Sequence, residues 1–292
     1  MDEKEFIEMT DMFFDIIMKN IINCNMALEI LYENEDLPVD EKRYLILMAF
    51  YRELFERLIS IKTLYHEKLI GSSNVVIRSF YEILLQLLFI LFPAEKCNEK
   101  IGCCIVYFSY KKMVDTQAYI GRDAALKNSE SWKNILSEKK KEYHKLQGVY
   151  VDIYKNKIEN SDRKYGSWYS LFNKSIKNIP ALANELDNMH LHEEFPKHWF
   201  ANIYRKIYNY LSEFSHGTTV LDAIHMTDND IQINDIHSLM NASVGIVCIY
   251  KLIETYNACV SSLYPHLKFD TIDLTFLKKL AEQIGKLDKQ QI

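Results

Sequence analysis

Residues 75–92 are apolar on every face when they are read as a helix. Their sequence is VVIRSFYEILLQLLFILF, and Pro93 follows directly. A helix that is hydrophobic all round is stable only where other elements cover it, so this segment predicts the central helix of a bundle. Its strongest apolar part, residues 83–92, is about half as long as the roughly 20 residues that cross a membrane. We therefore expect a buried core helix and no membrane partner.

The chain contains too few turn-forming residues for a β-rich fold. Its 292 residues include 8 glycines and 5 prolines, whereas a sandwich or barrel needs many tight turns. The sequence predicts an all-α fold, a multi-helix bundle of long antiparallel helices in a single domain over residues 1–292. Its expected parts are N-terminal helices within 1–71, a core of about 72–264, a C-terminal helix at 272–288, and a short irregular or β-hairpin insertion near 218–234.

Glycine, proline and capping residues indicate where the helices end. We expect a helix from Glu41 to Ile70 that ends at Gly71, after which residues 72–74 offer capping oxygens to the next helix. Pro180 is well placed at the start of a short helix. Further helices are expected at about 4–33, 98–125, 129–158, 167–176, 180–189, 197–217 and 236–264.

Charge and cysteine content limit the class of protein. The net charge is −5 with mixed signs throughout, so no general basic surface is expected, although a local patch would still serve a nuclease. The charged run at residues 138–142 favours a solvated helix face, with a contact for an anionic partner as the alternative. The six cysteines form no CxxC pair, and residues 1–9 lack the layout of a secretory signal. Reduced thiols and a cytoplasmic location are expected.

Two groups of polar residues lie in predicted helices. Arg78 and Glu82 are four residues apart on the apolar helix and can form an ion pair. Tyr208, Ser212 and His216 recur every four residues and therefore share one face of a later helix. The C-terminal end of that helix favours protonated His216, which suits an anion such as a phosphate. The alternative is a hydrogen-bonded network that only joins two helices.

Other chemistries have no motif in this sequence. The chain lacks GxGxxG, GxxxxGK[ST], GxSxG and HExxH, so we expect no nucleotide cofactor and no zinc-protease chemistry. A group of histidines and glutamates crowds a predicted loop, where a solvated turn is favoured and a metal site is the alternative. The members of this group are His190, His192, Glu193, Glu194 and His198. We expect no metal and no cofactor.

The polar groups resemble the motifs of a bacterial helical family of unknown function. Arg78-Ser-Phe-Tyr-Glu82 is similar to R-S-x-x-E, the segment from Tyr208 to His216 is similar to Y-x-x-x-S-x-x-x-H, and Trp168 lies between them. The resemblance covers roughly residues 40–260. Such proteins are similar to HEPN-like domains of toxin–antitoxin and phage-defence systems, in which an R-x4-6-H motif cleaves RNA, often across a dimer interface. No arginine precedes His216 at that spacing, so the resemblance implies that Arg78 or Arg205 takes its place.

The resemblance implies a metal-independent endoribonuclease of a bacterial defence or toxin system. The implied catalytic residues are Arg78, Glu82, Ser212 and His216, and the implied binding residues are Trp168, Arg205 and Tyr208. RNA is the expected substrate, and a second protein or a second copy of the chain is the expected partner. Two alternatives stay open. One is a non-catalytic interaction or sensor module whose cluster is structural or binds a small anion, and the other is a regulatory, antitoxin-like subunit.

Overall fold

A computed structural model describes much of the 292-residue chain. The described residues are 8, 11, 12, 14–16, 18, 19, 22, 41–67, 69–149, 167–190, 197–205, 224–227 and 230–233. The α-helices are α2 (Glu41–His66), α3 (Ile70–Leu91), α4 (Cys97–Arg122), α5 (Ala124–Asn128), α6 (Glu130–Val149), α8 (Trp168–Phe172) and α9 (Ile179–Asn188). Residues 199–205 are also helical, and η1 (Ala94–Lys96) is a 3₁₀ turn. The all-α bundle is confirmed.

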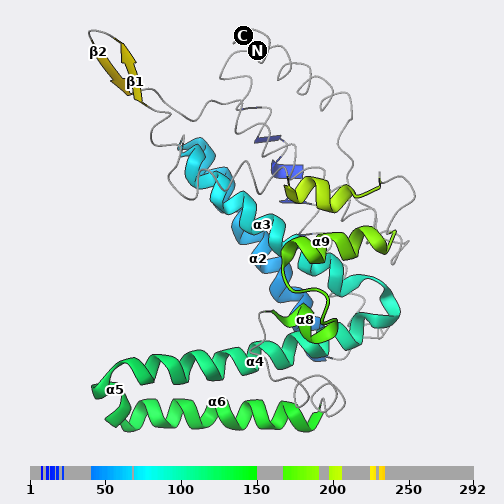
Figure 1. The fold of residues 1–292 in the computed structure, drawn as a ribbon, viewed down its shortest axis with the longest axis vertical. Coiled ribbons are helices and arrows are strands. Elements are labelled where there is room, and N and C mark those ends of the chain that lie inside the picture. Colours follow the sequence, from blue (N-terminus) through cyan, green and yellow to red (C-terminus); the bar gives the residue numbers. More distant parts are fainter. Residues whose placement is uncertain are drawn as a thin grey trace.

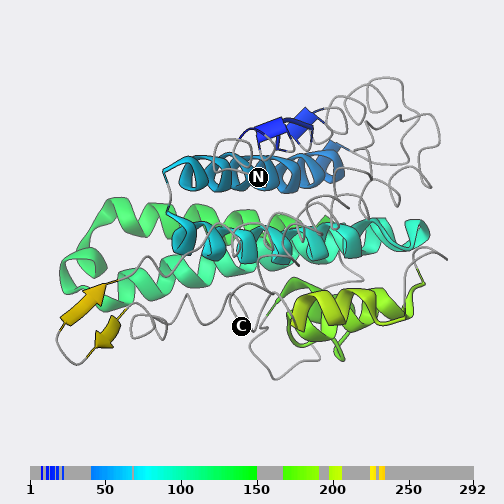
Figure 2. The same cartoon turned by 90° about the horizontal axis from the view of Figure 1, so that it is seen from above.

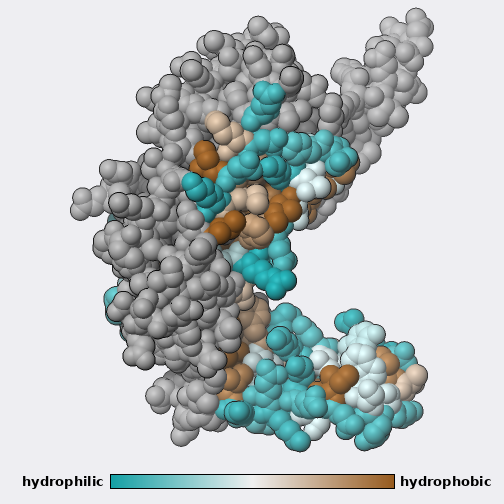
Figure 3. All heavy atoms as spheres, turned by 180° about the vertical axis from the view of Figure 1, so that it is seen from behind, coloured by the Kyte–Doolittle hydropathy of each residue, from teal (hydrophilic) through white to brown (hydrophobic). Residues whose placement is uncertain are grey.

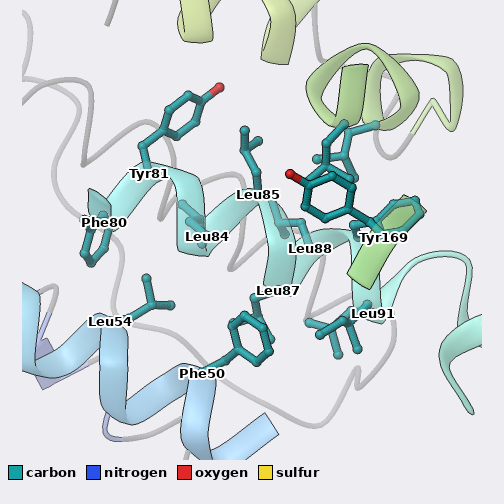
Figure 4. Packing of buried hydrophobic residues seen from close by; sticks show 14 of the residues in the cluster. Phe50, Leu54, Phe80, Tyr81, Leu84, Leu85, Leu87, Leu88, Leu91 and Tyr169 are labelled. Carbon is teal, nitrogen blue, oxygen red and sulfur yellow. The ribbon is translucent and has the colours of Figure 1, made fainter. Parts of the chain in front are cut away.

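Helix α3 is the central element, as its apolar sequence predicts. In Figure 2 it lies between α2 on one side and α9 with the helix at 199–205 on the other. Figure 4 shows Leu87 and Leu91 of α3 pointing toward Phe50 of α2, whereas Tyr81 and Leu85 point away from it. All five side chains are buried. Burial on both sides explains why apolar residues occupy most of the surface of α3.

Helix α4 leaves the body of the molecule and turns back as a hairpin. Its second half, α5 and α6 form an arm, defined here as residues 108–149, which extends away from the other helices (Figure 1). Asp123 creates the turn, because its side chain accepts a hydrogen bond of 2.7 Å from the backbone N–H of Ala125 and so caps α5. In Figure 3 the arm stands apart from the body, and hydrophilic residues make up much of its visible face.

The boundary between α2 and α3 differs from the prediction. Helix α2 ends at His66 and α3 already begins at Ile70, so Gly71 lies inside α3 rather than beyond the end of α2. Residues 72–74 are helical and are not caps; the N-cap position is Leu69, which makes no side-chain hydrogen bond. A helical glycine costs only about 1 kcal/mol relative to alanine, which tertiary packing readily offsets.

Two further local predictions are confirmed. Strands β1 (Ile224–Thr227) and β2 (Asp230–Ile233) pair antiparallel with Thr227 opposite Asp230, as expected for a hairpin with a two-residue connection. Pro180 lies in the first turn of α9, where Asn178 caps the helix by accepting a hydrogen bond from the N–H of Ala181. Residues 138–142 are exposed or half-buried, which fits both a solvated face and a contact for an anionic partner, so the choice between them stays a prediction.

Several predictions lie outside the described residues. They concern most of the first helix, the helix at 236–264 and the C-terminal helix, so the division into parts of a single domain stays a prediction. The described cysteines, Cys97, Cys103 and Cys104, are free thiols.

Helix α3 also resembles a membrane span in length and composition. Within the described residues, the stretch Gly71–Leu91 alone meets these criteria, and 61% of its most apolar window is buried inside the protein. That burial is typical of the core helix of a soluble protein, because the apolar side chains already contact other helices.

Candidate functional site

A row of polar side chains runs along the otherwise apolar helix α3. Asn74, Arg78, Glu82 and Gln86 follow one another at intervals of four residues. Residues four apart occupy neighbouring positions on successive turns, so the four side chains form one slanted stripe, called here the polar ladder. A polar stripe on a central helix costs free energy unless its members form hydrogen bonds or ion pairs.

The middle of the polar ladder is an ion pair. Arg78 Nε donates to Glu82 Oε1 at 3.1 Å, and the two side chains are 26% and 30% exposed. The prediction that these residues pair along the helix is confirmed. Gln86 Nε2 donates to the backbone oxygen of Glu82 at 3.2 Å, which extends the ladder by one turn. The pair is accessible enough for a ligand and buried enough to interact strongly with one.

Trp168 joins the polar ladder from a distant part of the chain. Its Nε1–H donates to Gln86 Oε1 at 2.8 Å across a sequence separation of 82 residues. The indole is 1% exposed, and its ring centroid lies 5.8 Å from that of Phe89. Helix α8 begins at this tryptophan, so the hydrogen bond fixes α8 to α3. Because the ring is covered, Trp168 acts on the ladder by holding Gln86.

The neighbouring Tyr169 also borders the ladder. Burial raises the pKa of its phenol, and the negative charge of Glu82 adds to that increase, while a hydrogen bond with Ser167 lowers it. The phenol therefore remains a neutral hydrogen-bond donor at physiological pH.

Asn74, at the first turns of α3, is the unusual member of the ladder. It is 0% exposed, and among the described residues neither its Oδ1 nor its Nδ2 has a hydrogen-bond partner. A buried polar group without a partner costs about 1–3 kcal/mol. Such a group in a native protein calls for an explanation, and a bound ligand is one of the accepted ones.

The helix that leads to the second predicted motif is anchored beside the polar ladder. The Asp187 carboxylate accepts hydrogen bonds from the backbone N–H groups of Phe200 at 2.8 Å and Ala201 at 2.9 Å, which caps this helix. Tyr81, adjacent to Glu82 in sequence, donates its hydroxyl to the backbone oxygen of Phe200 at 2.9 Å. The helix at 199–205 is therefore bonded directly to α3.

The remaining motif residues are only partly covered by the structure. Arg205 is helical and exposed. Tyr208, Ser212 and His216 lie outside the described residues, so their meeting with Arg78 stays a prediction.

The histidine-rich turn before this helix is also only partly described. His190 and His198 adopt positive φ angles of 48° and 62°. The backbone oxygen of His198 accepts a hydrogen bond from Asn202, so this residue starts the helix. The described part of the chain contains no group of three possible metal ligands, and His192, Glu193 and Glu194 lie outside it.

Two members of the polar ladder were not predicted as site residues. Asn74 falls among the residues predicted to cap the next helix, and Gln86 lies inside the apolar run at 83–92. The signal that identifies them is the repeated spacing of four between polar residues in an apolar helix, which extends the Arg78 and Glu82 pair in both directions.

Comparison with known proteins adds the family. A model of DUF5677, a family of unknown function, matches residues 44–233, a range that includes the polar ladder, the arm, Trp168 and the second motif. No curated protein and no solved structure matches the chain. Because the matched range covers more than half of the chain, this protein belongs to DUF5677, a family of unknown function.

Proposed function

We propose that this protein is a HEPN-like, metal-independent endoribonuclease of a bacterial defence or toxin system, acting in the cytoplasm. The observation that supports the proposal is the polar ladder on α3, where Arg78, Glu82 and Gln86 are bonded in series and Trp168 joins from another segment. Two of the three motif segments thus meet at one half-buried stripe. The helix at 199–205, which precedes the third segment in the sequence, is bonded to the same part of α3.

The chemistry needs a cation beside a proton-transferring group. In the proposed reaction a ribose 2′-hydroxyl loses its proton and attacks the adjacent phosphorus, the bond to the 5′-oxygen breaks, and His216 transfers a proton to this leaving oxygen, so that a cyclic phosphate and a 5′-hydroxyl form. Arg78 or Arg205 stabilises the negative charge that develops on the phosphate oxygens. Glu82 accepts a hydrogen bond from Arg78 Nε and so orients the guanidinium, a group that binds phosphate well. The spacing of four predicts that Ser212 and Tyr208 offer hydroxyl groups on the same helix face as His216.

The test compares two arginines with the same local geometry. Arg52 Nε bonds Glu56 Oε1 at 2.8 Å on α2, also with a spacing of four, but its side chain is 81% exposed. Arg78→Gln is expected to reduce RNA cleavage about 10²–10³-fold, the usual cost of losing a group that stabilises developing charge. Arg52→Gln should leave cleavage within about twofold, because surface substitutions rarely affect a distant site.

His216→Ala completes the experiment. It should abolish cleavage of a labelled RNA and toxicity on expression, while circular dichroism shows unchanged helix content. Full activity of His216→Ala would remove His216 from the mechanism. Equal losses in Arg78→Gln and Arg52→Gln would show that Arg78 contributes only general charge.

A second candidate function is a non-catalytic interaction or sensor module. The observation in its favour is that the bonds of the polar ladder also join helices, since Trp168 and Gln86 link α8 to α3. Purified protein that cleaves no RNA but co-purifies with a protein encoded nearby would support this function. A regulatory, antitoxin-like subunit would in addition be harmless when expressed alone.

A further inference from the structure

The arm differs in charge from the rest of the chain. Its 42 residues, 108–149, contain nine lysines and arginines and five aspartates and glutamates, a net charge of +4. The whole chain carries −5, so the remaining residues together carry −9. A basic segment that projects from an acidic protein concentrates its positive potential in one place, where it attracts anions.

Four of the five lysines of α6 are exposed, namely Lys133, Lys140, Lys141 and Lys145. At 3.6 residues per turn they fall within an arc of about 140° that does not include the buried Tyr143, whose ring centroid lies 5.6 Å from that of Tyr110 of α4. These four lysines are called here the basic face. Lys133 Nζ lies 3.8 Å from Glu130 Oε2 and forms an ion pair with it. Within the described residues, no ion pair involves the other three lysines, whereas Lys139 pairs with Glu142.

An exposed aromatic ring lies at the far end of the arm. Tyr119 of α4 is 53% exposed, and its ring packs against Trp132 of α6 with centroids 5.2 Å apart. The contact with Trp132 limits the movement of the tyrosine ring while one face stays open. From Lys133 to Lys145 the basic face spans about 18 Å at 1.5 Å per residue.

We propose that the basic face binds a single strand of RNA and that Tyr119 stacks on one of its bases. Positive charges along a helix, with an exposed aromatic ring at its end, match the alternation of phosphates and bases in a single strand. A membrane surface fits less well, because membrane-binding helices insert apolar side chains. Among the described residues, the large apolar side chains exposed on the arm are Phe108 and Tyr119, both on α4.

RNA as the ligand of the basic face rests on the proposed function, but the basic face lies outside the polar ladder. Binding can therefore be measured without cleavage. The probe is a fluorescein-labelled single-stranded RNA of about 20 nucleotides, longer than the 4–16 nucleotides of typical single-strand sites. All its riboses carry 2′-O-methyl groups, which remove the attacking hydroxyl of the proposed reaction. Anisotropy of this RNA is followed while full-length protein is added at several salt concentrations.

Two triple variants with equal charge change separate the basic face from general charge. Lys140→Gln, Lys141→Gln and Lys145→Gln together should weaken binding about tenfold or more. They should also reduce the slope of log K against log salt by about 2, since each lost phosphate contact contributes about 0.7. The control combines Lys174→Gln, Lys177→Gln and Lys197→Gln, which are exposed lysines of the body. It should bind within about twofold of the wild type.

Tyr119→Ala should weaken binding about tenfold without changing the salt slope, because stacking releases no counterions. Equal losses in the two triple variants, or no binding by the wild type, would overturn the inference. Binding to anionic vesicles or self-association would also overturn the inference if the triple variant of the basic face abolishes it. The basic face would then serve a membrane or a second copy of the chain. Binding through the arm without cleavage of unmodified RNA would support this inference and overturn only the proposed function.

Discussion

Helix α4 runs through both the body and the arm, and its two halves differ sharply. The eight residues from Lys100 to Tyr107 are all buried, whereas from Phe108 to Arg122 the one buried residue is Ile120. The first half contacts the body, where Figure 1 shows α8 beside it, and the second half is accompanied by α5 and α6. One continuous helix is therefore held by burial on all faces at one end and on a single face at the other.

Two lysines of α4 show what this difference means for a charged group. Lys100 is 0% exposed, and its Nζ donates hydrogen bonds to the backbone oxygens of Phe89 and Phe92 and lies 4.0 Å from the ring centre of Phe89. Residue 93 is proline, which has no N–H to continue the bonding of α3, so Lys100 supplies the missing donor to Phe89. Lys111 in the arm is 52% exposed and pairs with Asp115 at 3.1 Å.

The largest expected effect follows from removing the buried lysine. Lys100→Ala leaves a cavity and two backbone oxygens without their donor, so the free energy of unfolding should fall by about 3–5 kcal/mol. Lys111→Ala, the matched change in the arm, should alter it by less than about 0.5 kcal/mol. Urea unfolding followed by circular dichroism measures both values. Similar losses in the two variants would show that the halves of α4 do not differ in the way their burial indicates.

The same lysine should make stability depend on pH. Burial lowers the pKa of Lys100 from 10.5 to about 8, so between these values the folded chain has released a proton that the unfolded chain still holds. Stability therefore rises with pH across this window, by about 3 kcal/mol in total. The pH dependence of stability that arises from Lys111 has the opposite sign. The hydrogen bond to Asp115 raises the pKa of Lys111, so Lys111 stabilises the fold below pH 10.5, and this stabilisation is lost at higher pH.

The measurement is the free energy of unfolding at several pH values in the wild type and in Lys100→Met. Met has a similar length but no charge, so other titrating groups cancel in the difference. The wild type should gain stability relative to Lys100→Met as the pH rises from about 8 to about 10.5. A constant difference would mean that Lys100 keeps its proton in the folded protein.

The features that the sequence predicts well are those set by neighbouring residues. The apolar run at 75–92 indicates a central helix, and Pro180 marks the start of α9, because periodicity and capping act within a few turns. Burial of Lys100 and the bond between Trp168 and Gln86 depend on which helices meet in three dimensions. No local pattern contains that information. Gly71 illustrates the same limit, since packing of α3 outweighs its tendency to end a helix.

The smallest expected effect compares two tryptophans. Trp168→Phe keeps most of the apolar contact with Phe89 but removes the N–H that donates to Gln86, so a half-buried acceptor loses its partner. The free energy of unfolding should fall by about 1–3 kcal/mol.

Trp132→Phe in the arm should cost less than about 1 kcal/mol, since this half-buried ring has no hydrogen bond within the described residues and keeps an aromatic contact with Tyr119. Thermal unfolding of both variants shows which substitution lowers the stability more. If Trp132→Phe costs more, the arm rather than the polar ladder contains the more strongly held aromatic residue, and Trp168 does not secure α8 to α3.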